Sequence, residues 1–149
     1  MTLINKENVM KRILIANCIL LASTVAQASP QVDCLAKMAY MEARGINKQA
    51  VKDVTDVMFN RIKHHKFPDS VCKNINKKGQ SPWVAKGSKV KDIQTYKAIY
   101  KQVDSEYAKF KLGTWKDGTN GAMYFNNRLG KPYPKAKFLF KRNGHYFYK

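Results

Sequence analysis

Apolar residues recur at helical spacing early in the chain, and an acid shares their stripe. Leu35, Met38 and Glu42 stand at i, i+3 and i+7, so the carboxyl lies on the same helix face as residues that must meet a core. Asp33 on one side and Gly45 on the other are typical start and stop residues of a helix. The pattern therefore predicts a short helix between them with an acid on its apolar face.

Two longer helices are predicted further along the chain. Asn47 can cap the first of them, whose apolar face is formed by Ala50, Val51, Val54, Val57, Met58 and Ile62. Its acids Asp53 and Asp56 fall off that face, and we expect them to be solvated. Asp92 can cap the second, which has a wide apolar and aromatic stripe of Ile93, Tyr96, Ile99, Tyr100, Val103, Tyr107 and Phe110.

The remaining segments are predicted to be loops and short strands. Lys73 to Lys91 is basic and short of apolar residues, so we expect a long loop there. Ala122 to Phe125 and His145 to Tyr148 are rich in β-prone residues and can pair as a small sheet, with a basic loop over Arg128 to Phe140 between them. No repeat or second composition regime divides the chain. We therefore expect one α+β domain, mainly α, with a small β element near the C-terminus.

The first 28 residues have the pattern of a secretory signal peptide. Lys11 and Arg12 precede an uncharged run over 13–26, and Ala26-Gln27-Ala28 closes it, so we expect cleavage after Ala28. The run is shorter than the roughly 20 residues of a membrane span. We therefore expect export to the periplasm or the extracellular cell wall. An uncleaved membrane anchor is the alternative.

The charge balance points to an acidic partner. The chain has 28 Lys and Arg against 10 Asp and Glu, a net charge of +18. Three of the basic residues and Glu7 lie in the predicted signal, which leaves +16 after cleavage. An exported protein meets wall polymers and anionic lipid heads before it meets nucleic acid. We therefore expect anionic cell-envelope polymers as partners, no nucleic acid, and a monomer.

The cysteines predict a disulfide, and the histidines do not predict a metal site. Cys18 lies in the predicted signal, and Cys34 and Cys72 remain as an even pair, for which a disulfide is favoured over two free thiols in an oxidising compartment. His64 and His65 are adjacent, so on a helix their side chains point apart, and no further His or Cys follows at ligand spacing. We expect no metal and no cofactor.

Glu42 is the candidate general acid. Burial on an apolar stripe and a place in the last helical turn, at the negative end of the helix dipole, both raise the pKa of a carboxyl. A carboxyl that stays protonated near neutral pH can act as a general acid. The alternative is a structural ion pair of Glu42 with Arg44 or a lysine.

Gln80, Ser81 and Trp83 lie in the middle of the predicted long loop. An aromatic ring beside amide and hydroxyl groups suits a polar ligand with flat apolar faces, such as a sugar. A tryptophan folded back on the core is the alternative.

Six short motifs follow one another along the chain: Tyr40-Met41-Glu42-Ala43-Arg44-Gly45, Asn60-Arg61, Phe67-Pro68-Asp69-Ser70-Val71-Cys72, Gln80-Ser81-Pro82-Trp83, Asp117-Gly118-Thr119-Asn120-Gly121-Ala122-Met123-Tyr124-Phe125 and Gly144-His145-Tyr146-Phe147-Tyr148. Together they resemble the spore cortex-lytic (SleB-type) cell-wall hydrolases. The resemblance implies a lysozyme-like or lytic-transglycosylase-like, mainly helical fold that cleaves peptidoglycan glycan strands. It also implies that Glu42 is the catalytic acid and that residues 29–149 form the catalytic domain.

The chain departs from that family at two positions, with Ile46 where a second Glu is usual and Met41 where His is frequent. A two-carboxylate hydrolase needs a second acid across the scissile bond, and among the acids only Asp117 lies in a loop beside a matched motif. A lytic transglycosylase needs one carboxyl alone, so we expect that reaction at the MurNAc–GlcNAc bond. The expected substrate-binding residues are Gln80, Ser81, Trp83, Thr119, Tyr124 and His145.

Three other classes of function compete with this one. The departure at Ile46 keeps open a basic wall-binding protein with a degenerate site. An exported basic nuclease needs a His pair or a metal constellation that the sequence does not assemble. A zinc amidase fails for the same want of ligands.

Overall fold

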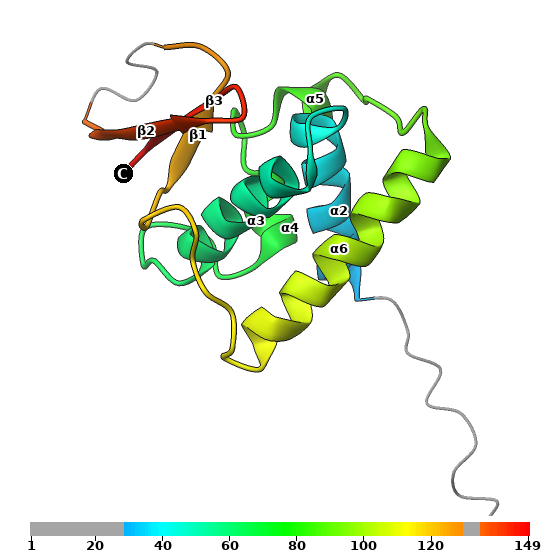
Figure 1. The fold of residues 1–149 in the computed structure, drawn as a ribbon, viewed down its shortest axis with the longest axis horizontal. Helices are drawn as coiled ribbons and strands as arrows, with labels where there is room; N and C mark the ends of the chain where they lie inside the picture. The colour runs from blue at the N-terminus through cyan, green and yellow to red at the C-terminus, as the bar shows by residue number, and fades with distance from the viewer. Residues whose placement is uncertain (1–28, 130–134) are drawn as a thin grey trace, which may run out of the picture.

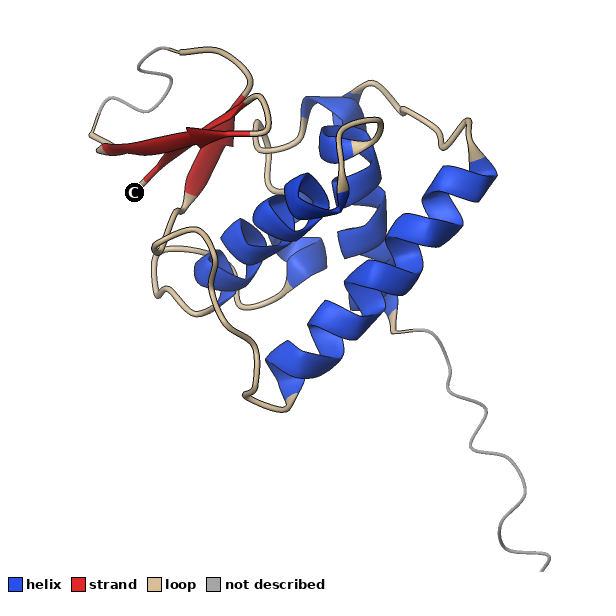
Figure 2. Ribbon diagram, viewed as in Figure 1, coloured by secondary structure: helices blue, strands red, loops and turns tan. Residues whose placement is uncertain are grey.

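The computed structural model describes residues 29–129 and 135–149 as a helical body with a small sheet on one side (Figures 1 and 2). The predicted signal peptide and its cleavage site lie outside these described residues, apart from Ser29 on its far side. Among the helices that are described, none has the length and apolar character needed to cross a membrane.

The helical body is built from α2 (Pro30–Ala43), α3 (Lys48–Ile62), α4 (Val71–Asn76) and α6 (Ile93–Lys111), with α5 (Pro82–Ala85) as a single turn beside them. α2 packs against α3, α4 and α6, and α3 also packs against α4 and α6. The apolar stripes expected from the sequence meet in this space and form one core. Its fully buried members include Leu35, Ala39, Tyr40, Val54, Phe59 and Val103.

The helix boundaries follow the expected capping residues except at the first helix. Asn47 and Asp92 cap α3 and α6, accepting hydrogen bonds from the backbone N–H of Ala50 (2.8 Å) and Thr95 (3.0 Å), as predicted. Asp33 is not the cap of α2, because the helix begins at Pro30 and Ser29 accepts the capping hydrogen bond. Pro at the first helical position has its φ already set for a helix, which explains the earlier start.

The predicted long loop over 73–91 contains two short helices. α4 begins at Val71, capped by Ser70, and its residues Val71 and Ile75 are buried in the core one helical turn apart. α5 begins at Pro82. The prediction of an unbroken loop was wrong because two apolar residues at i and i+4 are enough to dock one turn of helix on α2.

The sheet has three antiparallel strands in the order β1-β3-β2. β1 (Tyr124–Asn126) and β3 (His145–Tyr148) are the two runs expected to pair, and they do so with Tyr124 opposite Tyr148. β2 (Phe138–Arg142) lies partly within the segment expected to be a basic loop, so that prediction was wrong at its end. A tight turn at Asn143 and Gly144, both at positive φ, joins β2 to β3.

Asp53 and Asp56 are buried, which overturns the expectation that they are solvated. Both are 0% exposed. Asp56 accepts hydrogen bonds from Lys52 (2.7 Å), the Trp115 indole (2.8 Å) and the Gly118 backbone N–H (2.9 Å). Asp53 accepts two from Arg142 (2.8 and 2.7 Å). Most of these partners come from segments far along the chain, so the helical periodicity of α3 alone cannot predict them.

Cys34 and Cys72 form the expected disulfide, which joins α2 to α4 across a sequence separation of 38 residues.

We expect the double variant Cys34→Ser/Cys72→Ser to lose about 3 to 4 kcal/mol of unfolding free energy, because the bridge restricts the unfolded chain over a long loop. Urea unfolding of the mature protein measures this. Intact mass before and after reduction is the control, since the native bridge adds two hydrogens on reduction. Two free thiols in exported, native protein would contradict the pairing.

Arg142→Ala should leave the Asp53 carboxylate buried without its cationic partner. Breaking a fully buried pair costs about 3 to 5 kcal/mol, but the Arg142 side chain is 36% exposed, so we expect about 2 to 3 kcal/mol. Lys141→Ala, on the neighbouring exposed position, should change stability by less than about 0.5 kcal/mol. Equal urea midpoints for the two variants would disprove a structural role for the pair.

Candidate active site

A polar cavity of about 350 Å³ lies where α2, α3, the loop before α5 and the sheet meet. α2 contributes Met38, Met41 and Glu42, and α3 contributes Met58 and Arg61. The other walls are formed by Asn74, Gly79, Gln80, Ser81, Pro82, Phe125, Asn126, Asn127 and His145. The cavity thus collects residues from α2, α3, α4, the start of α5 with the loop before it, the end of β1 and the start of β3.

The Glu42 carboxyl accepts a hydrogen bond from Trp83 of α5, which is not among the residues that line the cavity. Glu42 lies in the last turn of α2, and the Trp83 indole N–H donates a hydrogen bond of 2.9 Å to Oε1. Trp83 is the second residue of α5, the single helical turn that begins at Pro82. The sequence predicted Trp83 as a sugar-stacking surface, whereas here its nitrogen edge faces the acid.

Burial raises the pKa of Glu42, and the Trp83 hydrogen bond and the positive charge of Arg61 oppose part of that rise. The net effect is an upward shift, as the sequence predicted. Arg44, the residue expected in the alternative ion pair, lies instead over the Tyr40 ring, 4.8 Å from its centre. The cation whose charge acts on the Glu42 carboxyl is therefore Arg61 and not Arg44.

Among the described residues that line the cavity, Glu42 is the one acidic side chain. Asp117, the candidate second carboxylate, lies outside the lining, in the loop before β1. Burial raises the pKa of Asp117, but hydrogen bonds from Thr119 and Gly121 outweigh it and lower the pKa overall. Asp117 is therefore an ionised, structurally engaged acid.

His145 reaches the cavity from β3 and is 4% exposed. Its Nδ1 has no hydrogen-bond partner among the described residues. Burial lowers the pKa of His145, against smaller opposing effects of the Glu42 backbone and the charge of Asp53. The imidazole is therefore neutral near pH 7.

The other expected binding residues separate into two groups. Gln80 and Ser81 line the cavity with Glu42. Thr119 does not: it is fully buried and donates a hydrogen bond of 2.6 Å to Asp117. Tyr124 lines a different pocket, on the other face of β1.

Arg61, Asn74, Asn126 and Asn127 line the cavity although the sequence gave them no role. The sequence motifs could have pointed to three of these residues. Arg61 belongs to the Asn60-Arg61 motif, and Asn126 and Asn127 directly follow the motif that ends at Phe125. Of the two departures from the family pattern, Met41 lines the cavity, whereas Ile46 is 44% exposed and does not.

The family model described as Cell Wall Hydrolase matches residues 46–148. The chain belongs to this cell wall hydrolase family. The match begins just after Glu42, so family membership does not by itself assign the acid. No curated protein matches the chain.

Two solved structures share the fold of this cell wall hydrolase. The catalytic domain of the Bacillus cereus SleB protein has a TM-score of 0.59 at 22% identity, covering 80% of this chain and 89% of that one. The catalytic domain of the germination-specific lytic transglycosylase SleB from Bacillus anthracis has a TM-score of 0.61 at 21% identity, covering 85% of this chain and 100% of that one. The mainly helical, SleB-like fold expected from the sequence is confirmed.

Trp83→Phe should raise the pKa of Glu42 further, because the lost N–H donor stabilises the carboxylate form. The carboxyl ¹³C shift of Glu42, followed by NMR across pH and assigned with Glu42→Gln, measures the change. Trp115→Phe is the matched control, since that indole donates to Asp56 and should leave the titration of Glu42 in place. An unchanged or lower pKa in Trp83→Phe would show that the hydrogen bond does not form in solution.

Proposed function

We propose that this cell wall hydrolase is a peptidoglycan lytic transglycosylase that cleaves the MurNAc–GlcNAc bond, with Glu42 as general acid and then general base. The observation that carries the proposal is the presence of one acidic side chain, with a raised pKa, among the described residues that line the cavity. The description of the Bacillus anthracis relative as a lytic transglycosylase supports the reaction type.

The reaction needs one proton to be delivered and one to be recovered. Glu42 donates its proton to the glycosidic oxygen as the bond to MurNAc C1 breaks, and the GlcNAc unit leaves with a free hydroxyl. The 6-hydroxyl oxygen of the same MurNAc then bonds to C1, and its proton returns to the Glu42 carboxylate. The product is a 1,6-anhydro ring, no water is consumed, and the carboxyl is restored.

The surroundings of Glu42 suit both halves of this cycle. Trp83 engages Oε1, so Oε2 is the oxygen that we assign to carry the proton. Burial favours the protonated state before cleavage, and the charge of Arg61 stabilises the carboxylate formed by it. Gln80, Ser81, Asn126 and Asn127 supply amide and hydroxyl groups for the sugars. The neutral His145 forms part of the cavity wall.

A two-carboxylate hydrolysis fits this cavity less well. That mechanism needs a second carboxyl within about 5 to 9.5 Å of the first. Asp117 is committed to Thr119 and Gly121, with hydrogen bonds of 2.8 and 2.5 Å from their backbone N–H groups. Ile46 does not line the cavity, so its replacement of the family's Glu removes no acid from the lining in this conformation.

The disulfide, the signal pattern and the charge support an exported enzyme acting on the envelope. We place the catalytic domain at residues 29–149 and propose that anionic envelope polymers attract it electrostatically. Thr119, which is buried, would act by fixing the Asp117 loop.

Glu42→Gln should lower peptidoglycan cleavage by roughly 100- to 10,000-fold, because the amide keeps the shape but cannot deliver a proton. Release of soluble fragments from purified peptidoglycan measures the rate, and mass analysis of wild-type products should show 1,6-anhydromuramic ends. Reducing muramic ends, heavier by one water, would indicate hydrolysis instead. An active Glu42→Gln enzyme would refute the assignment.

Two further measurements separate catalysis from folding. Asp117→Asn should cost far less activity than Glu42→Gln if one carboxyl suffices.

Because the folded-state pKa of Glu42 is raised, wild-type stability should increase as pH falls from that pKa toward the unfolded value of 4.5. Glu42→Gln should lack this contribution and be as stable as wild type, or more so, at pH 7. A strongly destabilised variant would point to a structural ion pair.

A further inference from the structure

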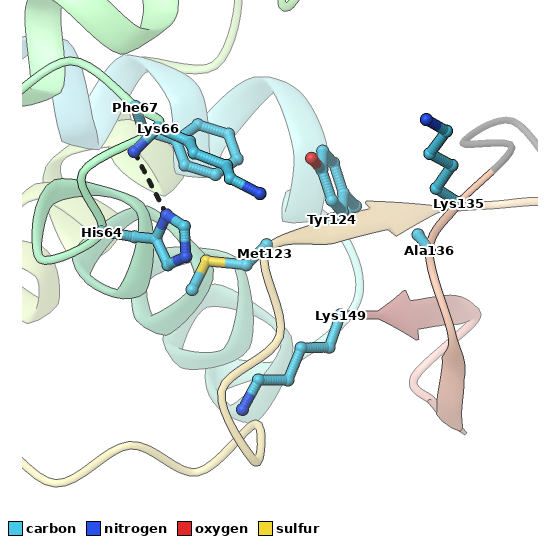
Figure 3. Close-up of a pocket in the computed structure, with 8 residues that line it drawn as sticks. All are labelled: His64, Lys66, Phe67, Met123, Tyr124, Lys135, Ala136 and Lys149. Atoms are coloured by element: carbon cyan, nitrogen blue, oxygen red, sulfur yellow. Dashed lines mark hydrogen bonds between the residues drawn. The ribbon is translucent and has the colours of Figure 1, made fainter.

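A second pocket, of about 530 Å³, lies on the other face of β1 from the Glu42 cavity. It is lined by His64, Lys66, Phe67, Met123, Tyr124, Lys135, Ala136 and Lys149 (Figure 3). We call it the lysine pocket. Neither Glu42 nor the disulfide cysteines line this pocket. Among its described lining residues, Tyr124 is the one that the sequence predicted to bind substrate.

The lining of the lysine pocket combines apolar surface with positive charge. The Phe67 and Tyr124 rings lie 5.8 Å apart, and Met123 and Ala136 add further apolar atoms. Figure 3 shows Lys66 and Lys135 on opposite sides of Tyr124. No Asp or Glu side chain is among the described residues that line it. A complementary ligand therefore carries anionic groups on a partly apolar body.

The lysine pocket and the Glu42 cavity share a wall. Arg61 lines the cavity, and its guanidinium lies 5.4 Å from the centre of the Phe67 ring and 5.6 Å from that of Tyr124. Tyr124 and Phe125 are successive residues of β1, so their side chains point to opposite faces, Tyr124 to the lysine pocket and Phe125 to the cavity. The two pockets therefore lie back to back across Arg61 and β1, which is an outer strand of the sheet.

We propose that the lysine pocket binds the anionic stem peptide attached to the glycan strand whose sugars occupy the Glu42 cavity. This inference rests on the proposed function. A stem peptide leaves the muramic acid sideways through its lactyl group and carries free carboxylates on a backbone with methyl and aliphatic groups. A polyol-phosphate polymer of the wall has the charge but no apolar part for Phe67, Met123 and Tyr124 to contact. The pocket therefore makes this enzyme selective for glycan strands that keep their peptides.

The test compares two substrates on matched variants. The substrates are soluble glycan strands with stem peptides and the same strands after an amidase has removed the peptides. Cleavage of both is measured for three proteins: wild type, Lys66→Gln/Lys135→Gln and Lys97→Gln/Lys101→Gln. The last variant removes the same charge from exposed positions on α6, on the far side of the helical body from the sheet (Figure 1).

Wild type and the α6 variant should prefer the peptide-bearing strands in kcat/KM by roughly 3- to 10-fold, the range that two exposed charge contacts provide. Lys66→Gln/Lys135→Gln should lose most of that preference. Equal preference in all three proteins, or no preference in wild type, would overturn the proposal. A wild type inactive on both substrates would instead sink the proposed function, and the binding experiment would then decide the inference.

The binding experiment needs no catalysis. A synthetic L-Ala-γ-D-Glu-diaminopimelate tripeptide is titrated into Glu42→Gln protein and followed by NMR shifts of the Tyr124 and Phe67 rings. Shifts that saturate in Glu42→Gln and vanish when Lys66→Gln/Lys135→Gln is added support the inference. Shifts caused by poly(glycerol phosphate) but not by the tripeptide would overturn it in favour of a phosphate polymer.

Discussion

The buried carboxylate of Asp56 is the constraint on which the C-terminal part of the structure depends. Burial raises the pKa of this group, and only its hydrogen-bond partners make the charged form tolerable there. Two of those partners, Trp115 and Gly118, belong to the segment that follows α6. If that segment moved away, the buried carboxylate would keep Lys52 but lose its hydrogen bonds from Trp115 and Gly118, so the chain after α6 is held against α3.

From this anchor the polar face of α3 positions the wall of the cavity. Asp53 pairs with Arg142 at the end of β2. Arg61 donates a hydrogen bond of 2.6 Å to the carbonyl of Met123, and Asn60 donates one of 3.2 Å to that of Ala122, both just before β1. One face of α3 thus packs in the helical core while the other carries the sheet. The part of the cavity wall that the sheet forms is thus attached to α3.

The sequence was sufficient for the three longer helices, for two of the three strands and for the place of Glu42 in the last turn of α2, because each depends on local spacing. It failed where the deciding partner is distant, as for Asp53, whose arginine lies 89 positions away. It also grouped Tyr124 and Thr119 with the cavity residues because they share a motif. A one-residue step along a strand reverses the face, so Phe125 and not Tyr124 reaches the cavity, and sequence proximity does not reveal this.

The strand order places β3, which follows β1 and β2 in the chain, at the centre of the sheet. β3 lies between β1 and β2, and each outer strand pairs with β3 alone among the described strands. While a nascent chain emerges from the ribosome or a translocation channel, α2, α3, α4 and α6 appear first, and they already include Glu42 and both cysteines of the disulfide. The wall that includes His145 cannot form until β3 has followed. The helical body therefore leaves the ribosome or channel before β3, the strand that brings His145 to the cavity.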